Sequence, residues 1–239
     1  MKKTLIPFLL FSLLINSCKK ENELIKDGIY EFEGIIAGRN PVMYTRAGII
    51  TDRSIINSYI VRIQSQGWGT SQYDSIFGFD IPPSTMNFSM RLRIENKKGY
   101  FYRPMWGPDG YKEYELDLRS LPNNEMLGTY KDSATAYLAT TCRNLFQKVN
   151  KYQGEYDTIR WTSSGSTIGP IVQFQQFLPI IAESNNVIVI PSFAYFVSPE
   201  SCYPTHSLTL NQLNPNLVYD LSPGDTVLIR QRPIRLVRK

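Results

Sequence analysis

The chain has 239 residues, of which 42% are hydrophobic and 20% are charged, so the composition is that of a globular protein and not of a disordered one. Aromatic residues make up 13%, and the abundance of Tyr among them favours β-strands. The formal net charge is +5, but the Lys and Arg residues are not gathered into a long basic run. We therefore expect a mildly basic surface and no nucleic-acid partner.

The N-terminus has the organisation of an export signal. Lys2 and Lys3 precede the apolar stretch Leu5 to Ile15, which is too short to span a membrane because a transmembrane helix needs about 20 apolar residues. The stretch runs into Ile15-Asn16-Ser17-Cys18, which resembles the lipobox of bacterial outer-membrane lipoproteins. An aliphatic residue stands three positions before the cysteine and a small residue directly before it, with Asn16 as a less usual residue between them.

The resemblance implies that residues 1–17 are a signal peptide and that the thiol of Cys18 is joined to lipid, with a further acyl chain such as palmitate on the new N-terminus. Each buried methylene group contributes roughly 0.8 kcal/mol, so two or three chains anchor a protein to a membrane. Residues 18–26 would then form a charged tether, and residues 27–239 the globular body. No Asp follows Cys18, so the resemblance favours the outer membrane and leaves its periplasmic or cell-surface face open.

The body from Asp27 onward predicts an antiparallel β-sandwich or barrel, because short alternating segments are separated by Gly, Pro and Asn turns. Its opening, Gly28-Ile29-Tyr30, is similar to that of lipocalin-like barrels, with Tyr30 in place of their Trp. The segment Ile171 to Ile181 fits a strand or a helix that Pro179 would interrupt. The other predicted strands are Gly28–Ile36, Thr45–Thr51, Ser54–Gln64, Tyr73–Asp80, Asn87–Glu95, Gly99–Arg103, Tyr111–Leu118, Tyr156–Thr162, Val187–Ile190, Ser192–Val197, Thr226–Arg230 and Ile234–Val237.

One segment departs from the strand pattern. Apolar residues at helical spacing predict one amphipathic helix over residues 133–148, with Asp132 or Ser133 as its N-cap. The turn-forming run Leu121-Pro122-Asn123-Asn124 comes shortly before it and leaves open a subdivision of the body near residues 121–132.

The cysteines and the single histidine offer little chemistry. If Cys18 carries lipid, Cys142 and Cys202 remain, and in an oxidising compartment a disulfide between them would close a loop of about sixty residues and contribute roughly 4 kcal/mol. The alternative is two buried free thiols, because Cys142 lies on the apolar face of the predicted helix. His206 has no marked third group for a Cys–His nucleophile, and no phosphate-loop, dinucleotide or zinc-protease motif is present. The sequence thus predicts no catalytic residue, no metal site and no cofactor.

The aromatic stretch Tyr100 to Tyr111 is the most suggestive binding feature. Exposed aromatic side chains on turns stack against sugars and anchor protein interfaces, while the alternative is that they fill the core of a β domain. The candidate ligand-binding residues are Trp106, Tyr102, Tyr111 and Trp68.

Carboxylates share strand faces in two places, with Glu31 and Glu33 in one and Glu113, Glu115 and Asp117 in the other. A glycosidase needs two carboxyl groups about 5–10 Å apart, but any solvated strand face satisfies that distance. We therefore expect a lipid-anchored cell-envelope module that binds a glycan or an envelope protein without catalysis. A structural subunit of an envelope assembly is the alternative, followed by a glycan-acting hydrolase.

Overall fold

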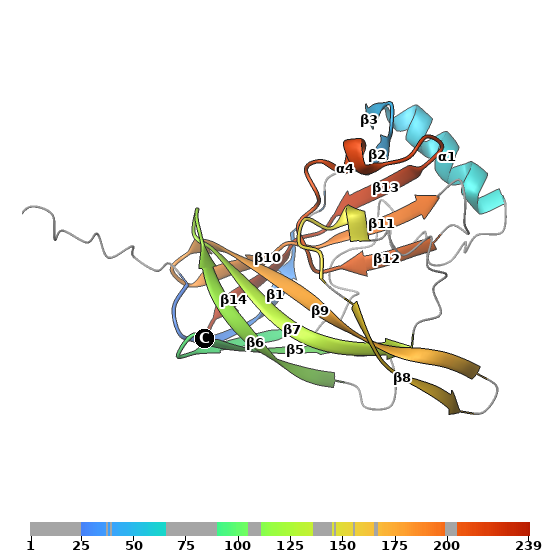
Figure 1. The fold of residues 1–239 in the computed structure, drawn as a ribbon. Coiled ribbons are helices and arrows are strands. Elements are labelled where there is room, and N and C mark those ends of the chain that lie inside the picture. The colour runs from blue at the N-terminus through green and yellow to red at the C-terminus, as the bar shows by residue number, and fades with distance from the viewer. Residues whose placement is uncertain are drawn as a thin grey trace, which may run out of the picture.

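The computed structural model describes residues 25–36, 38, 40–65, 90–104, 111–135, 145, 147–154, 156–164, 167–198 and 205–239. The described chain is mainly β and is built around a closed antiparallel barrel, which confirms the predicted fold class (Figure 1). Each barrel strand pairs with the barrel strand that follows it in the chain, and the last strand pairs with the first. The barrel strands are β1 (Gly28–Ile35), β4 (Arg91–Glu95), β5 (Lys98–Pro104), β6 (Tyr111–Leu121), β7 (Glu125–Thr135), β9 (Thr167–Ser184), β10 (Val187–Ile190) and β14 (Ile234–Arg238).

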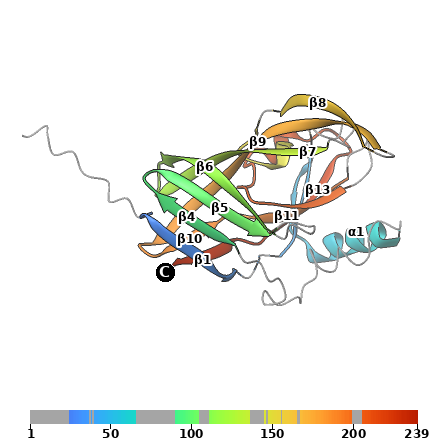
Figure 2. The same ribbon diagram turned by 90° about the horizontal axis from the view of Figure 1, so that it is seen from below.

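Strand β9 closes the barrel and also extends beyond it. Its 18 residues pair with β7 over Ile171 to Ile181, and its C-terminal end pairs with β10. Its N-terminal part also pairs with β8 (Tyr156–Ser164), which projects from the barrel together with β9 (Figures 1 and 2). The segment that fitted either a strand or a helix is therefore a strand, with Pro179 opposite Leu127.

A second sheet is built from two insertions into the barrel. The first insertion follows β1 and contributes β2 (Val42–Thr45) and β3 (Gly48–Ile50). The second follows β10, and the sheet order is β12-β11-β13-β2-β3. The second insertion contributes β11 (Phe193–Ser198), β12 (Thr205–Thr209), the short helix α4 (Leu217–Asp220) and β13 (Thr226–Gln231).

The chain segments that join the barrel to the second sheet are bonded to one another. The amide of Ile36 donates to the carbonyl of Pro233 at 2.8 Å, and the amide of Arg232 donates to the carbonyl of Ser192 at 2.8 Å. The hydroxyl of Ser192, itself buried, donates back to the carbonyl of Arg232. These crossings link the segments that follow β1 and β10 to the segment that precedes β14, and so hold the barrel against the second sheet.

Residues 53–65 form a helix, so the strand predicted over Ser54–Gln64 is wrong. In α1 (Arg53–Ser65) the apolar side chains Ile56, Tyr59 and Ile63 recur at helical spacing and are buried against the second sheet. The carboxylate of Asp52 caps the helix by accepting hydrogen bonds from the amides of residues 54 and 55, at 2.7 and 3.2 Å. Figures 1 and 2 show α1 beside this sheet and away from the barrel.

The helix predicted over residues 133–148 begins too early. Ser133–Thr135 are the last residues of β7 and pair with β9, so Asp132 is a strand residue and not a helix cap. Residues 145 and 147–149 are helical, and Leu145 and Val149 pack under the second sheet. The possible subdivision near residues 121–132 falls on the β6–β7 hairpin, whose turn holds Asn123 and Asn124 at φ 63° and 59°.

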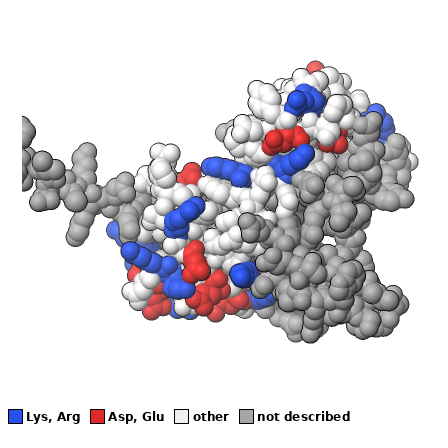
Figure 3. All heavy atoms as spheres, viewed as in Figure 1, with Lys and Arg blue, Asp and Glu red and all other residues white. Residues whose placement is uncertain are grey.

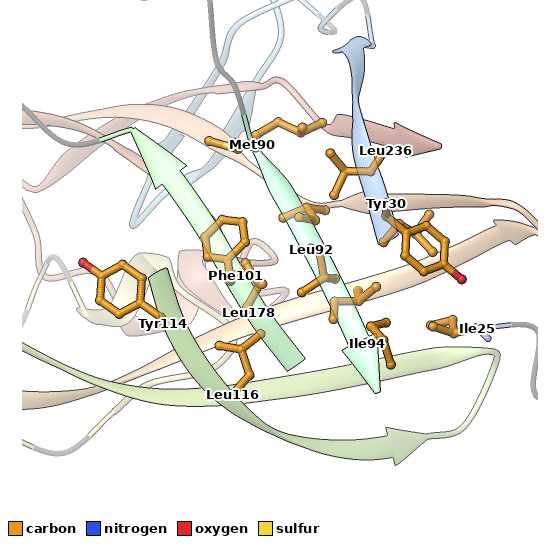
Figure 4. Close-up of a cluster of buried hydrophobic side chains, with 14 of the residues drawn as sticks. Ile25, Tyr30, Met90, Leu92, Ile94, Phe101, Tyr114, Leu116, Leu178 and Leu236 are labelled. Atoms are coloured by element: carbon orange, nitrogen blue, oxygen red, sulfur yellow. The ribbon is translucent and has the colours of Figure 1, made fainter. Parts of the chain in front are cut away.

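The barrel interior is filled by apolar side chains. Leu92, Phe101 and Leu116 are fully buried within it, and Figure 4 shows them pointing toward one another with Leu178. Tyr30 and Tyr114 lie on opposite sides of this cluster and turn their hydroxyl groups away from it (Figure 4). Within the described residues, no helix has the length and apolar character needed to cross a membrane.

Candidate functional site

Charged side chains enter the barrel interior at one end, where β5 leads into β6. Side chains alternate between the two faces of a strand, so Arg103 shares the interior face of β5 with Phe101, and Lys112 shares that of β6 with Tyr114. On β7 the same face carries Tyr130 and Asp132. We call Arg103, Lys112, Tyr114, Tyr130 and Asp132 the charged cluster.

Asp132 is the centre of the charged cluster. Its side chain is 9% exposed, and its Oδ1 lies 2.8 Å from Nζ of Lys112. The hydroxyl of Tyr114 donates to Oδ2 at 3.0 Å, and Nη2 of Arg103 approaches the same oxygen at 3.4 Å. A carboxylate so far removed from water requires partners of this kind, because burial of an unpaired charge is costly.

The two cations also lie against aromatic rings. Nζ of Lys112 is 4.4 Å and Cζ of Arg103 is 5.2 Å from the centroid of the Tyr114 ring. The rings of Tyr114 and Tyr130 are in contact, with centroids 4.7 Å apart and planes tilted by 53°. The rings of Tyr114 and Tyr130 therefore separate the charged groups from the apolar core of the barrel.

Burial and charge set the protonation states in the charged cluster. Burial raises the pKa of Tyr130 to about 12, although the charge of Arg103 partly opposes this. Partial burial works against the charge of Lys112, but hydrogen bonds to Asp132 and Tyr114 outweigh it and raise the pKa of the ammonium group. At neutral pH Tyr130 is therefore neutral, and both Lys112 and Arg103 are cationic.

Tyr102 does not belong to the charged cluster. It lies on the outer face of β5, where the guanidinium of Arg91 sits 5.1 Å from its ring centroid and Glu113 is its neighbour on β6. Strand alternation thus separates Tyr102 from Arg103, its neighbour in the sequence.

The remaining predicted residues are only partly placed. The backbone of Tyr111 begins β6 and pairs with Pro104, and the backbone of His206 in β12 pairs with Phe196. The predicted ligand-binding residues Trp106 and Trp68 lie outside the described residues, as do Cys18, Cys142 and Cys202 and the strand predicted over Tyr73–Asp80.

The carboxylates considered for glycosidase chemistry lie on the outer surface of the barrel, where Glu31, Glu33, Glu115 and Asp117 form exposed ion pairs. Glu115 and Asp117 share the ammonium group of Lys98, at 2.9 and 2.8 Å. Glu33 pairs with Arg235 at 2.8 Å, and Figure 3 shows basic and acidic side chains interspersed over the barrel. These pairs make a solvated strand face, since exposed ion pairs leave the carboxylates hydrated.

No member of the charged cluster was predicted from the sequence as a ligand-binding residue. Arg103 lies within the aromatic stretch and Lys112 directly follows it, and that proximity was the one available signal. Asp132 was assigned to a helix start, so its approach to β5 and β6 had no counterpart in the sequence pattern. The bond between Arg103 and Asp132 joins residues 29 positions apart, which only strand pairing brings together.

The fold and the charged cluster define a closed β-barrel protein with an apolar core and a charged end. Comparison with known proteins finds no family model, no curated protein and no solved structure that matches the chain. In the part of the chain that the structure describes, no three His, Cys, Asp or Glu residues are grouped so that they could hold a metal ion.

Proposed function

We propose that this protein is a lipid-anchored binding module of the cell envelope, and that it binds a glycan or a protein at the charged end of the barrel. The observation that carries the proposal is the placement of Arg103, Lys112 and Asp132 on interior-facing positions of an otherwise apolar barrel. Buried charges lower the stability of a protein unless they are well paired. A group of charged side chains at one end of the barrel is therefore more typical of a binding site than of a core.

The packing of the barrel core supports binding at the charged end of the barrel and not in its interior. Leu92, Phe101 and Leu116 fill the interior, so an apolar ligand has no room among the described core side chains. In the sequence, Trp106 lies between Arg103 of β5 and Lys112 of β6. An aromatic residue next to charged groups suits a sugar or a protein surface, both of which offer apolar faces and polar groups.

The anchor part of the proposal rests on the sequence. Ile15-Asn16-Ser17-Cys18 has the form of a lipobox, and Ile25, near the end of the expected tether, packs into the barrel core. Replacement of the acceptor in Cys18→Ser should move the protein from the membrane fraction to the soluble fraction after cell lysis. Retention of Cys18→Ser in the membrane fraction would refute lipid anchoring. Protease treatment of intact cells then distinguishes the cell-surface face from the periplasmic face.

The binding experiment uses the full-length protein extracted in mild detergent and immobilised envelope glycans and envelope proteins. The variants Arg103→Gln and Trp106→Ala should weaken capture, and the matched control Arg93→Gln should not. Arg93 suits this purpose because it lies on the outer face of β4, with its guanidinium 3.8 Å from the ring centroid of Tyr100. Capture that is equal for all three variants would show that the charged end is not the binding site.

A structural subunit of an envelope assembly is a second proposal, and strand β8 favours it. Among the described strands β8 pairs only with β9, so one edge of the long sheet is available for a strand from another chain. The basic C-terminal strand is a poor docking element, since β14 pairs with β1 on one side and with β10 on the other. A stable complex that co-purifies after mild extraction would support this role, and monomeric elution would contradict it.

A further inference from the structure

The guanidinium of Arg103 is the incompletely paired member of the charged cluster. Its Nη2 makes two long hydrogen bonds, each 3.4 Å, to the hydroxyl of Tyr114 and to Oδ2 of Asp132. Its Nε is buried and has no hydrogen-bond partner among the described residues. A guanidinium group has five N–H donors, and a buried donor left unpaired destabilises the protein, so the guanidinium of Arg103 can donate hydrogen bonds to a further anion.

The net charge of the charged cluster also favours the binding of an anion. Arg103 and Lys112 contribute two positive charges and Asp132 one negative charge, so the charged cluster, counted over these described residues, has an excess positive charge. Asp132 accepts hydrogen bonds from Lys112 and Tyr114 at 2.8 and 3.0 Å, so the carboxylate is well bonded while Arg103 is not. The buried donor that lacks a partner among the described residues of the cluster, Nε of Arg103, therefore belongs to a cation.

We propose that the charged end of the barrel binds an anionic group of its ligand, a carboxylate or a phosphate, through Arg103 and Lys112. This inference rests on the proposed binding function and names the chemistry of its ligand. The planar fork of an arginine matches the two oxygens of a carboxylate or phosphate, and a lysine adds a point charge. Asp132 is a positioning residue here, because its bonds hold both cations at one end of the barrel.

The surroundings strengthen such a contact. The side chain of Arg103 is 28% exposed and that of Lys112 is 45% exposed, so solvent reaches both cations from outside. Tyr114 and Tyr130 close the site from below and exclude water from the barrel side. A charge pair at such a boundary interacts more strongly than it would in bulk water.

The test measures equilibrium binding of small probes to the full-length protein in mild detergent. The probes are galacturonate as a carboxylate source, inorganic phosphate, and galactose as the neutral control. We expect galacturonate or phosphate to bind and galactose not to bind, with affinity that falls as salt is added. Whichever anion binds identifies the source of the charge.

Variants assign the binding to the charged cluster. Arg103→Gln should weaken anion binding about tenfold or more, and Arg103→Lys, which keeps the charge but loses the fork, should weaken it less. Asp132→Asn keeps one side-chain oxygen to hold Lys112 but removes the negative charge that competes with the ligand for both cations, so it should strengthen binding. Arg93→Gln on the outer face is the matched control and should bind as the unaltered protein does. The melting temperature of each variant shows whether it is folded.

Two results would overturn the inference and differ in what they say about the proposed function. If galactose binds as well as galacturonate and Arg103→Gln weakens both, the charged end is a binding site but anion recognition is wrong. If no anion binds at millimolar concentration, or if anions bind equally to Arg103→Gln and to the unaltered protein, anion recognition is wrong as well. In that case capture of immobilised glycans or proteins decides separately whether the protein is a binding module.

Discussion

The hydrogen bond between Tyr114 and Asp132 should stabilise the fold measurably. The hydroxyl donates to Oδ2 over 3.0 Å, Tyr114 is 3% exposed, and the carboxylate side chain is 9% exposed. A hydrogen bond to a charged acceptor contributes about 1.5–3 kcal/mol. Lys112 is 45% exposed and admits water to one side of the carboxylate, so we place Tyr114→Phe at the lower end, about 1.5 kcal/mol.

A double-mutant cycle tests this assignment. The free energy of unfolding is measured in urea by circular dichroism for Tyr114→Phe, Asp132→Asn and the double variant. Because Tyr114→Phe removes the donor and Asp132→Asn removes the charge of the acceptor, both changes act on the same bond, and the double variant should lose about 1 kcal/mol less than the sum of the two. The matched control is Tyr100→Phe on the outer face of β5, which should change stability by no more than about 0.5 kcal/mol. Additivity of Tyr114→Phe and Asp132→Asn within about 0.3 kcal/mol would refute the coupling.

Three further predictions concern other parts of the fold. Asp52→Ala removes the N-cap of α1 and should cost about 1 kcal/mol of local stability, seen as faster amide hydrogen exchange in Arg53–Ser65 with unchanged exchange in the barrel. Leu92→Ala in the barrel core should lower the free energy of unfolding by about 2–5 kcal/mol, and Val61→Ala, 62% exposed on α1, should leave it nearly unchanged in urea unfolding. Tyr130 has its pKa raised by burial from 10.0 to about 12, so its contribution to stability is present below pH 10 and is lost as the pH rises toward 12. Alkaline unfolding followed by circular dichroism should therefore be steeper in the unaltered protein than in Tyr130→Phe; equal slopes would contradict this.

The helix α1 was predicted as a strand, and its residue composition explains the error. Residues 55, 56, 59, 61 and 63 are apolar or β-branched, and such a composition favours a strand. The spacing of Ile56, Tyr59 and Ile63 and the capping residue Asp52 favour a helix instead, and the second sheet accepts that face. Tertiary burial of one helical stripe outweighed the intrinsic preference of the residues.

The charged cluster could not be predicted, because the residues that form it come from three strands. Lys112 and Asp132 are 20 positions apart, and no local periodicity announces their ion pair. The predicted binding residue Tyr102 is the neighbour of Arg103 in the aromatic stretch, but strand alternation turns its side chain to the outer face.

The sequence by itself determined the positions of most described strands and turns. The turn at Ser222 to Asp225 and the strands on either side of Pro191 follow from local preferences, which are present before any tertiary contact forms. Only the tertiary structure decided that β9 meets β10 to close the barrel, that two insertions share a second sheet, and that Asp132 reaches Arg103. These features depend on pairing between distant segments, and such pairing is selected by the burial of whole strand faces and not by the residues of any one segment.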